Sequence, residues 1–489
     1  MTIIQETPPA GVSMESVFAD FNRKYPCYQA SYALDQLRTR EYARLDRRGH
    51  AYLDYTGGGL YAERQVLEHQ GLLLNNVFGN PHSINPTSSL ATEMVEKSRR
   101  YVLEFFNASP EEYAVIFTAN ASGALKLVGE SYPFNPGSQL LLTFDNHNSV
   151  NGIREFARAR SARLTYLAMN APDLRMDENL LLSYLESADP RQNNLFAFPA
   201  QSNFSGVQHS LEWIAAAQQR GWDVIADCAA FVATNRLDLS RWHPDFVPLS
   251  FYKMFGYPTG LGCLLARKTA LEKLHRPWFS GGSVFAASVR GDAYYLADNE
   301  AGYEDGTVNY LDIPAVEIGL QHLNATGIDL IHERVICLTG WLLETLQSLR
   351  HKNNKPLVKI YGPQDTQMRG GTIPLNILNP DGKVIDERIV EQAAMERLIS
   401  IRTGCFCNPG AGEIAFNLPK AALGGMFAGG ERLSYDEYLA LLGLPSSGAL
   451  RVSLGLVTNF TDVYRFVEMA CTFLDRFPES SPLKPRTHC

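Results

Sequence analysis

The chain has 489 residues, of which 45% are hydrophobic and 20% are charged, as in an ordinary globular protein. Its formal net charge of −8, with no basic block, argues against general nucleic-acid binding, because phosphate neutralisation requires clustered positive charge. No apolar run is long enough for a membrane helix, and the N-terminus lacks the basic and apolar regions of a signal peptide. Eight cysteines without CxxC spacing predict neither a disulfide framework nor a metal site, so a reduced, cytoplasmic protein is expected.

Short apolar segments alternate with amphipathic segments through the first two thirds of the chain. This alternation predicts an α/β protein with a parallel sheet. The predicted strands span residues 113–117, 139–143, 195–198, 224–226 and 262–266. The predicted helices span residues 122–132, 211–220, 313–323 and 328–349.

The last third of the chain mixes strand and helix signals. Strands are predicted at residues 357–361, 372–377, 399–402 and 450–454. This mixture predicts a smaller α+β domain beside the first one. We expect a large domain at residues 46–325 and a small domain built from residues 1–45 and 326–489, with a frayed tail from about Pro478.

A candidate phosphate site follows the first predicted strand, in the sequence FTANASGALK at residues 117–126. A helix that begins near Ser122 would present free N–H groups and the positive end of its dipole to an anion. An ordinary helix cap has the same sequence pattern, so this segment alone is not specific.

A carboxylate and a lysine follow in an aromatic, glycine-punctuated context. Asp227 ends a predicted strand, and Lys253 lies between Tyr252 and Met254. Burial favours the neutral amine, which can form an imine, and a strand-end aspartate can keep a pyridine nitrogen protonated. Each residue alone could be a surface lysine or a helix cap. The chain order of phosphate site, aspartate and lysine nevertheless predicts pyridoxal 5'-phosphate.

Longer motifs resemble class V aminotransferases of the cysteine desulfurase type, and among them the N-terminal pyridoxal-dependent domain of molybdenum cofactor sulfurases. The motifs are YLDYTGGGLY at 52–61, GNPHS at 79–83, PAQSNFSG at 199–206, SFYKMFGYPTG at 250–260 and RTGCFCNPG at 402–410. The resemblance extends from about residue 52 to residue 474. It implies a fold-type-I PLP-dependent transferase with a mixed, mainly parallel seven-stranded sheet, a smaller α+β domain and a homodimeric assembly.

The resemblance also implies residue roles around the cofactor. Lys253 would bind pyridoxal phosphate covalently and then move the Cα proton, Asp227 would pair with the pyridine nitrogen, and His147 would stack on the ring. The implied phosphate ligands are Ala121, Ser122, Ser250 and, from across a dimer interface, Thr307.

The implied substrate is L-cysteine or a related amino acid. Asn203 would contact the ring hydroxyl or the substrate carboxylate, and Arg451 would bind that carboxylate through its planar guanidinium. Cys407, five residues after Arg402, would attack the substrate sulfur as a thiolate on a glycine-flanked loop and carry a persulfide. Cys405 is a helper or a bystander.

The sequence departs from the family pattern at several positions. Glycines at Thr56–Gly59 replace an alanine-containing element, which leaves the true substrate open. Ala230 replaces a polar residue that contacts the ring hydroxyl, and Tyr252 replaces the usual histidine before the lysine. A complete molybdenum cofactor sulfurase continues beyond the position of Cys489, so we expect the sulfur acceptor to be a separate molecule.

The expected activity is therefore that of a PLP-dependent cysteine desulfurase, which leaves alanine and a Cys407 persulfide. One alternative is a cysteine or selenocysteine β-lyase, which gives pyruvate or alanine without a persulfide on Cys407. Another is a non-catalytic sulfur carrier or binding protein with the same fold.

Overall fold

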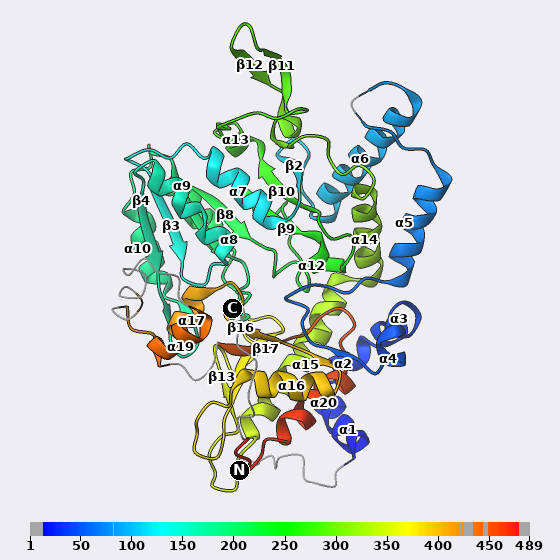
Figure 1. Ribbon diagram of the computed structural model, residues 1–489, viewed down its shortest axis with the longest axis vertical. Coiled ribbons are helices and arrows are strands. Elements are labelled where there is room, and N and C mark those ends of the chain that lie inside the picture. The colour runs from blue at the N-terminus through cyan, green and yellow to red at the C-terminus, as the bar shows by residue number, and fades with distance from the viewer. Residues whose placement is uncertain (1–12, 82, 421–422, 424–433, 444–447, 479–489) are drawn as a thin grey trace.

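The computed structural model describes residues 13–81, 83–420, 423, 434–443 and 448–478 (Figure 1). His82 of the GNPHS motif and the predicted frayed tail beyond Pro478 lie outside these residues. Within the described ranges, no helix combines the length and the apolar character needed to cross a lipid bilayer.

A seven-stranded sheet forms the upper half of the view in Figure 1. Its order is β2 (Tyr113–Thr118), β10 (Gly262–Arg267), β9 (Phe246–Ser250), β8 (Trp222–Asp227), β7 (Asn194–Pro199), β3 (Gln139–Thr143) and β4 (Arg163–Leu167). Strand β10 is antiparallel to both of its neighbours, and every other pair is parallel. The predicted mixed, mainly parallel sheet is confirmed.

Both faces of this sheet are buried, as a parallel sheet requires. Ala114 and Ile116 of β2 join an apolar cluster with α7 (Ala121–Ser131) and α9 (Ile153–Ala159). Val115 and Phe117 point to the opposite face and join the larger core. The helices with buried residues in that core include α6 (Pro86–Phe105), α10 (Glu178–Glu186), α11 (Glu212–Gln218) and α14 (Ile313–Thr326).

Two strands of the sheet were not predicted. Pro248 interrupts the pattern of β9, since proline lacks the N–H group that a central strand normally contributes. Strand β4 lies at the sheet edge and buries only Leu167 fully, so its sequence lacks a continuous apolar run.

A second sheet lies in the lower half of Figure 1 and is antiparallel throughout. Its order is β13 (Val358–Ile360), β14 (Thr372–Ile377), β17 (Ala449–Ser453) and β16 (Arg402–Gly404). With it lie α15 (Ile328–Ser348), α16 (Glu387–Glu396) and α20 (Phe460–Cys471). The segment predicted as one strand at 399–402 is divided, because β15 (Ile399–Ser400) pairs with β1 (Ala51–Tyr52) instead. The domain boundaries at residues 46 and 325 stay a prediction.

The remaining elements are short helices and hairpins. The helices are α1 (Met14–Lys24), α2 (Cys27–Ala30), α3 (Ala33–Glu41), α4 (Arg44–Arg47), α5 (Glu63–Asn75), α8 (Asn148–Asn151), α12 (Phe251–Phe255), α13 (Lys268–Leu271), α17 (Pro409–Ala415), α19 (Tyr435–Leu442) and the 3-10 helix Asn299–Tyr303. One hairpin pairs β5 (Met169–Asn170) with β6 (Arg175–Met176). The other, β11 (Val284–Ser288) with β12 (Ala293–Leu296), projects from the top of Figure 1.

Candidate active site

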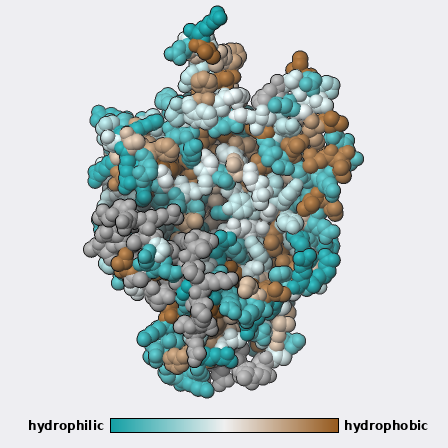
Figure 2. All heavy atoms as spheres, viewed as in Figure 1, coloured by the Kyte–Doolittle hydropathy of each residue, from teal (hydrophilic) through white to brown (hydrophobic). Residues whose placement is uncertain are grey.

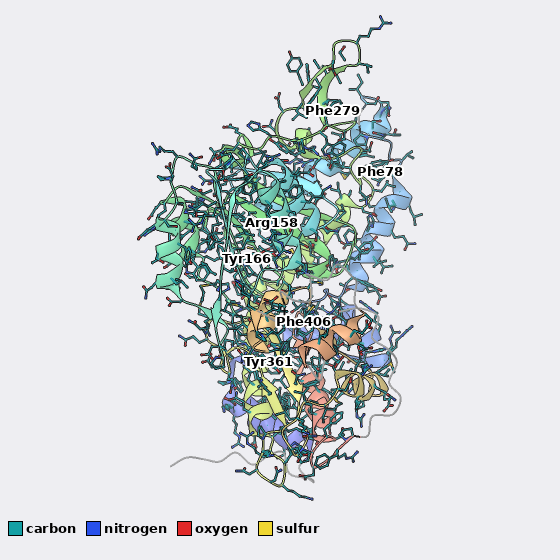
Figure 3. The ribbon with its side chains drawn as sticks, turned by 60° about the vertical axis from the view of Figure 1, so that its left-hand side comes forward. Phe78, Arg158, Tyr166, Phe279, Tyr361 and Phe406 are labelled. Carbon is teal, nitrogen blue, oxygen red and sulfur yellow. The ribbon has the colours of Figure 1, made fainter. Side chains whose placement is uncertain are left out.

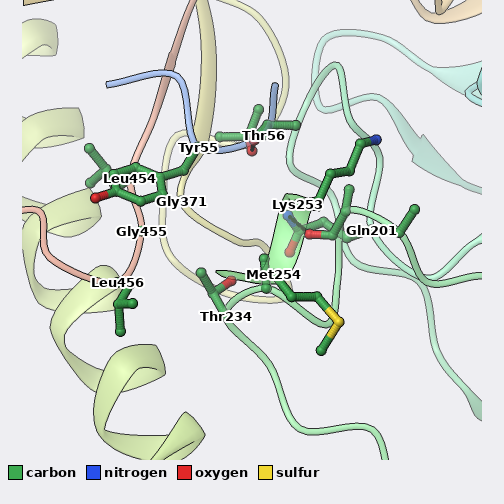
Figure 4. A pocket seen from close by; sticks show the side chains of 14 residues that line it. Tyr55, Thr56, Gln201, Thr234, Lys253, Met254, Gly371, Leu454, Gly455 and Leu456 are labelled. Atoms are coloured by element: carbon green, nitrogen blue, oxygen red, sulfur yellow. Dashed lines mark hydrogen bonds between the residues drawn. The ribbon is translucent and has the colours of Figure 1, made fainter. Parts of the chain in front are cut away.

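One pocket brings together residues that lie far apart in the sequence. Its lining includes Asn120, Ala121, Ser122, His147, Asn203, Asp227, Ser250, Tyr252 and Lys253. Most of these residues follow the carboxyl ends of neighbouring strands, which is where α/β sheets place ligand sites. A second pocket shares Lys253 and Gln201 with the first and is lined also by Thr56 and Met254 (Figure 4).

Hydroxyl groups and a helix N-terminus form one end of the first pocket. Asn120 caps α7 with its side chain, so the helix begins at Ala121. The N–H of Ala121 donates to the Ser250 hydroxyl at 2.9 Å, and the hydroxyls of Ser122 and Ser149 are 2.5 Å apart. Such an arrangement suits a phosphate group, because N–H and O–H donors converge where the helix dipole is positive.

Asp227 is buried in this pocket, and Lys253 is half-buried beside it. Burial lowers the pKa of Lys253, although the nearby Asp227 carboxylate opposes that shift. Burial raises the pKa of Asp227, and the positive charge of Lys253 opposes it. The N–H of Ala229 donates to Asp227 Oδ1 at 3.0 Å and holds the carboxyl group. The site therefore offers a readily neutralised amine and an oriented carboxylate.

His147 is held in one tautomer by its own turn. The N–H of Ser149 donates to His147 Nδ1 at 3.1 Å, which leaves the proton of the neutral ring on Nε2. Burial, followed by the positive charges of Lys253 and Arg451, lowers the pKa of His147 to about 4. The imidazole is therefore neutral at physiological pH.

We expect the His147 ring to titrate near pH 4 rather than near 6.5 in the cofactor-free chain. The unfolded chain gains its proton near pH 6.5, whereas the folded chain does not, so His147 lowers the free energy of unfolding progressively as the pH falls from 6.5 toward 4. The effect is on the order of 3 kcal/mol. An NMR titration of the histidine resonances measures the pKa, and the His147→Gln variant assigns the resonance. A titration midpoint near pH 6.5 for His147 contradicts the expectation.

Arg451 is buried and is not among the residues that line the pocket, although it contacts one of them. Its Nη1 donates to the backbone oxygen of Asn203 at 3.1 Å, and its guanidinium carbon lies 4.7 Å from the centroid of the Phe406 ring. Burial lowers the pKa of Arg451 to about 10, although Asp54 opposes the shift. Asp54 pairs with this arginine and belongs to the YLDYTGGGLY motif, which the sequence analysis quoted without giving the aspartate a role.

The Cys407 loop is tethered directly to the pocket. The N–H of Asn148 donates to the backbone oxygen of Cys407 at 2.7 Å, and Asn203 Nδ2 donates to that of Phe406 at 2.7 Å. Both Phe406 (φ 56°) and Cys407 (φ 53°) adopt the left-handed conformation, which costs a non-glycine residue about 1 kcal/mol or more. These tethers hold the loop, which lies where the upper and lower parts of the molecule meet (Figure 3).

The two cysteines of the loop differ in state. Cys407 is a free, exposed thiol, whereas Cys405 is half-buried and is not among the free cysteines. Cys407 also contributes to the pKa of Lys253, so its sulfur is within electrostatic reach of the amine. Of the two, Cys407 fits the nucleophile better.

Asn408 is a site residue that the sequence analysis missed. It is buried, and its Nδ2 donates to the backbone oxygen of Asp145 at 2.6 Å and to Asn203 Oδ1 at 2.9 Å. Asp145 in turn accepts a 2.8 Å bond at Oδ2 from His209. Asn408 also caps α17, and an asparagine before proline is a sequence pattern that indicates such a cap. Its contacts with Asp145 and Asn203 join distant parts of the chain, so no local sequence pattern indicates them.

Thr307 is not part of the pocket that the described residues of one chain form. Its hydroxyl accepts from Asn80 Nδ2 at 3.3 Å. Its predicted contact with a phosphate of a second copy stays a prediction.

The glycines of Thr56–Gly59 allow close packing rather than widening the pocket. A Cβ at Gly59 would lie 3.1 Å from the backbone oxygen of Tyr252, to which the Gly59 N–H donates at 2.9 Å. A Cβ at Gly57 would lie 2.5 Å from Asp54 Oδ2. At Gly59 the segment can therefore approach the backbone of the Lys253 helix closely only without a side chain, whereas Gly57 leaves room for the side chains of Asp54 and Arg402.

We expect Gly410→Ala to destabilise the Cys407 loop, because the added Cβ would lie 2.1 Å from the backbone oxygen of Phe144. Overpacking against backbone costs about 1–3 kcal/mol of unfolding free energy. Gly412→Ala in the same helix is the matched control, since its nearest atom lies 3.7 Å away and alanine favours helix. Chemical denaturation compares the two; equal stabilities contradict the expectation.

Comparison with known proteins identifies the family of this chain. A family model described as Aminotransferase class-V matches residues 51–466. The molybdenum cofactor sulfurase of Arabidopsis thaliana is 35% identical, over 93% of this chain and 60% of the relative. The Homo sapiens molybdenum cofactor sulfurase is 34% identical, over 89% of this chain and 51% of the relative. The chain thus spans little more than half the length of these curated relatives.

Solved structures share the fold at low sequence identity. The apo structure of a cysteine desulfurase from Thermococcus onnurineus NA1 has a TM-score of 0.72 at 22% identity, over 90% of this chain and 98% of that one. The cystine C-S lyase C-DES, in complex with its reaction product cysteine persulfide, has a TM-score of 0.65 at 17% identity, over 87% and 98%. A C-DES mutant with glycine covalently linked to its PLP cofactor has a TM-score of 0.66 at 17% identity, over 89% and 99%. From its matched residues, the chain belongs to the class-V aminotransferase family.

Proposed function

We propose that the protein is a pyridoxal-phosphate-dependent cysteine desulfurase, which transfers sulfur from L-cysteine to Cys407 and leaves alanine. The observation that carries this proposal is the tether between the exposed Cys407 loop and the pocket of Lys253, Asp227 and His147. The names of the similar sulfurases and desulfurases support it.

The donor set of the pocket fits pyridoxal phosphate. Ala121, Ser122 and Ser250 would hold the phosphate, and the buried Asp227 would hold a proton on the pyridine nitrogen. When bound, pyridoxal phosphate supplies an electron sink for negative charge at the substrate Cα. Burial lowers the pKa of Lys253. Its amine would bind the aldehyde and then move the Cα proton.

Cys407 would perform the sulfur transfer. Its thiolate attacks the Sγ of the substrate, so an S–S bond forms as the Cβ–S bond breaks. The electron pair of the broken bond stays with the substrate carbon, which takes up a proton and becomes the methyl group of alanine. Arg451 would hold the substrate carboxylate throughout. An acceptor thiol then receives the outer sulfur of the persulfide.

The proposal specifies the sulfur acceptor only as a thiol. The matched sulfurases are longer than this chain, and their names refer to the molybdenum cofactor. The residues described here give no basis for adding that cofactor to the proposal, which ends at the Cys407 persulfide.

Product identity separates this proposal from a β-lyase, the activity that the C-S lyase similarity favours. The cofactor-loaded protein is incubated with L-cysteine and a thiol reductant, and alanine and pyruvate are measured separately. Alanine with sulfide supports the desulfurase, whereas pyruvate establishes a lyase. If the protein shows the colour of the bound cofactor but forms neither product, the remaining interpretation is a non-catalytic sulfur carrier.

We also propose a homodimer in which Thr307 reaches the phosphate of the other copy. Exposed apolar side chains on and after α5 support it, since Leu74, Val77 and Ile84 are 77%, 73% and 99% exposed, and Figure 2 shows apolar residues gathered at the right-hand edge over this helix. Light scattering should give twice the mass of one chain, and Thr307→Ala should weaken cofactor affinity about tenfold. A monomer with unchanged affinity contradicts this arrangement.

A further inference from the structure

Two arginines face each other beside the Lys253 pocket. Arg402 of β16 and Arg451 of β17 are directly opposite in the antiparallel register. Like charges at opposite positions on neighbouring strands are destabilising. This arrangement therefore requires a negative charge between them.

Asp54 provides that charge. Arg451 Nη2 donates to Asp54 Oδ1 at 3.0 Å, and Arg402 donates to Asp54 Oδ2 from Nη2 at 2.8 Å and from Nε at 3.1 Å. The burial of the two cations differs, because the Arg451 side chain is 3% exposed and that of Arg402 is 50% exposed. A buried cation without a partner is strongly unfavourable, so Arg451 depends on Asp54 more than Arg402 does.

Arg451 still has capacity for a ligand. Its hydrogen bonds go to Asp54 and to the backbone of Asn203, and its buried Nε has no hydrogen-bond partner among the described residues. The Phe406 ring covers one face of the guanidinium. Its charge also lowers the pKa of both Lys253 and His147, which places it within electrostatic reach of the reacting groups.

We propose that Asp54 is a positioning residue that prepares Arg451 for the substrate carboxylate. This inference rests on the proposed function. Asp54 holds Arg451 against the repulsion of Arg402, so that the remaining N–H groups of Arg451 bind an α-carboxylate beside Lys253. This arrangement of Asp54 and the two arginines also requires that Gly57 has no side chain. A Cβ at Gly57 would lie 2.5 Å from both Asp54 Oδ2 and Arg402 Nη2.

The test compares two ligands of the cofactor-loaded protein. L-Cysteine carries an amine, a thiol and the α-carboxylate. Cysteamine carries the same amine and thiol groups but has no carboxylate. Binding of each is followed by the change in the visible spectrum of the cofactor. Asp54→Asn keeps the side-chain size and should weaken L-cysteine binding by roughly 10- to 100-fold, while cysteamine binding changes by less than about twofold.

The controls separate positioning from a general loss of structure. Asp329→Asn breaks an exposed ion pair with Arg236 and should leave both affinities unchanged. If Asp54→Asn does not fold, Asp54→Glu keeps the charge but displaces the carboxylate, and should show the same selective loss. Equal loss for both ligands, or unchanged or tighter binding of L-cysteine, overturns the proposal.

The spectral readout does not depend on the product. If the wild-type protein binds L-cysteine but forms no alanine, the proposed function fails while the role of Asp54 is still decided by the selective loss. If alanine forms and the loss is not selective, the role of Asp54 fails alone.

Discussion

Replacing Lys253 by alanine is expected to abolish turnover of L-cysteine, with a loss of at least about 10³-fold. Lys253 is the lysine whose pKa burial lowers in the pocket, and it lies within electrostatic reach of Asp227, His147 and Cys407. The variant loses both the amine that binds the aldehyde and the base that moves the Cα proton. Absorbance of the lysine-bound cofactor and steady-state alanine production measure the two losses.

Lys126→Ala is the matched control, because Lys126 is on α7 near the same pocket but its side chain is 67% exposed. It should retain the absorbance and the rate of the wild-type protein. Substantial alanine production by Lys253→Ala, with Lys126→Ala also active, would remove Lys253 from the mechanism.

Replacing Cys407 by alanine is expected to stop alanine and sulfide formation, again by at least about 10³-fold, while cofactor binding is retained. The residue is exposed on a tethered loop rather than in the cofactor pocket itself, so its removal should not disturb the cofactor. Mass spectrometry of the wild-type protein after one turnover should find one additional sulfur on the peptide that contains Cys407.

Cys27→Ala is the control for this experiment, since Cys27 is also an exposed cysteine but lies on α2 of the N-terminal segment. Its activity should equal that of the wild type. An active Cys407→Ala variant, or additional sulfur on Cys27 alone, would show that another group accepts the sulfur.

The strand-end residues could be predicted from the sequence because their signals are local. Asp227 directly follows an apolar run, and Ser122 follows a strand and a turn of small residues. Each pattern joins a secondary-structure boundary to a chemical group. Parallel strands then bring such ends to one edge of the sheet, which is why the structure places them around one pocket.

The tertiary contacts of the site could not be predicted in this way. Asp54 and Arg451 are 397 residues apart, and their pairing depends on how β1 and β17 come together. The amide of Asn408 contacts Asp145 and Asn203, on loops that follow two different strands. Strand β9 was not predicted because it contains Pro248, and proline is disfavoured within a central strand. The sheet nevertheless accommodates this proline.

The ratio of alanine to pyruvate, formed from L-cysteine by the cofactor-loaded protein with a thiol reductant, distinguishes a desulfurase from a lyase most directly. We expect alanine and sulfide in equal amounts, with no pyruvate, because Cys407 removes the sulfur while the carbon skeleton keeps its nitrogen. Pyruvate and ammonia as the main products would contradict it, and would make Cys407 a surface thiol on a lyase.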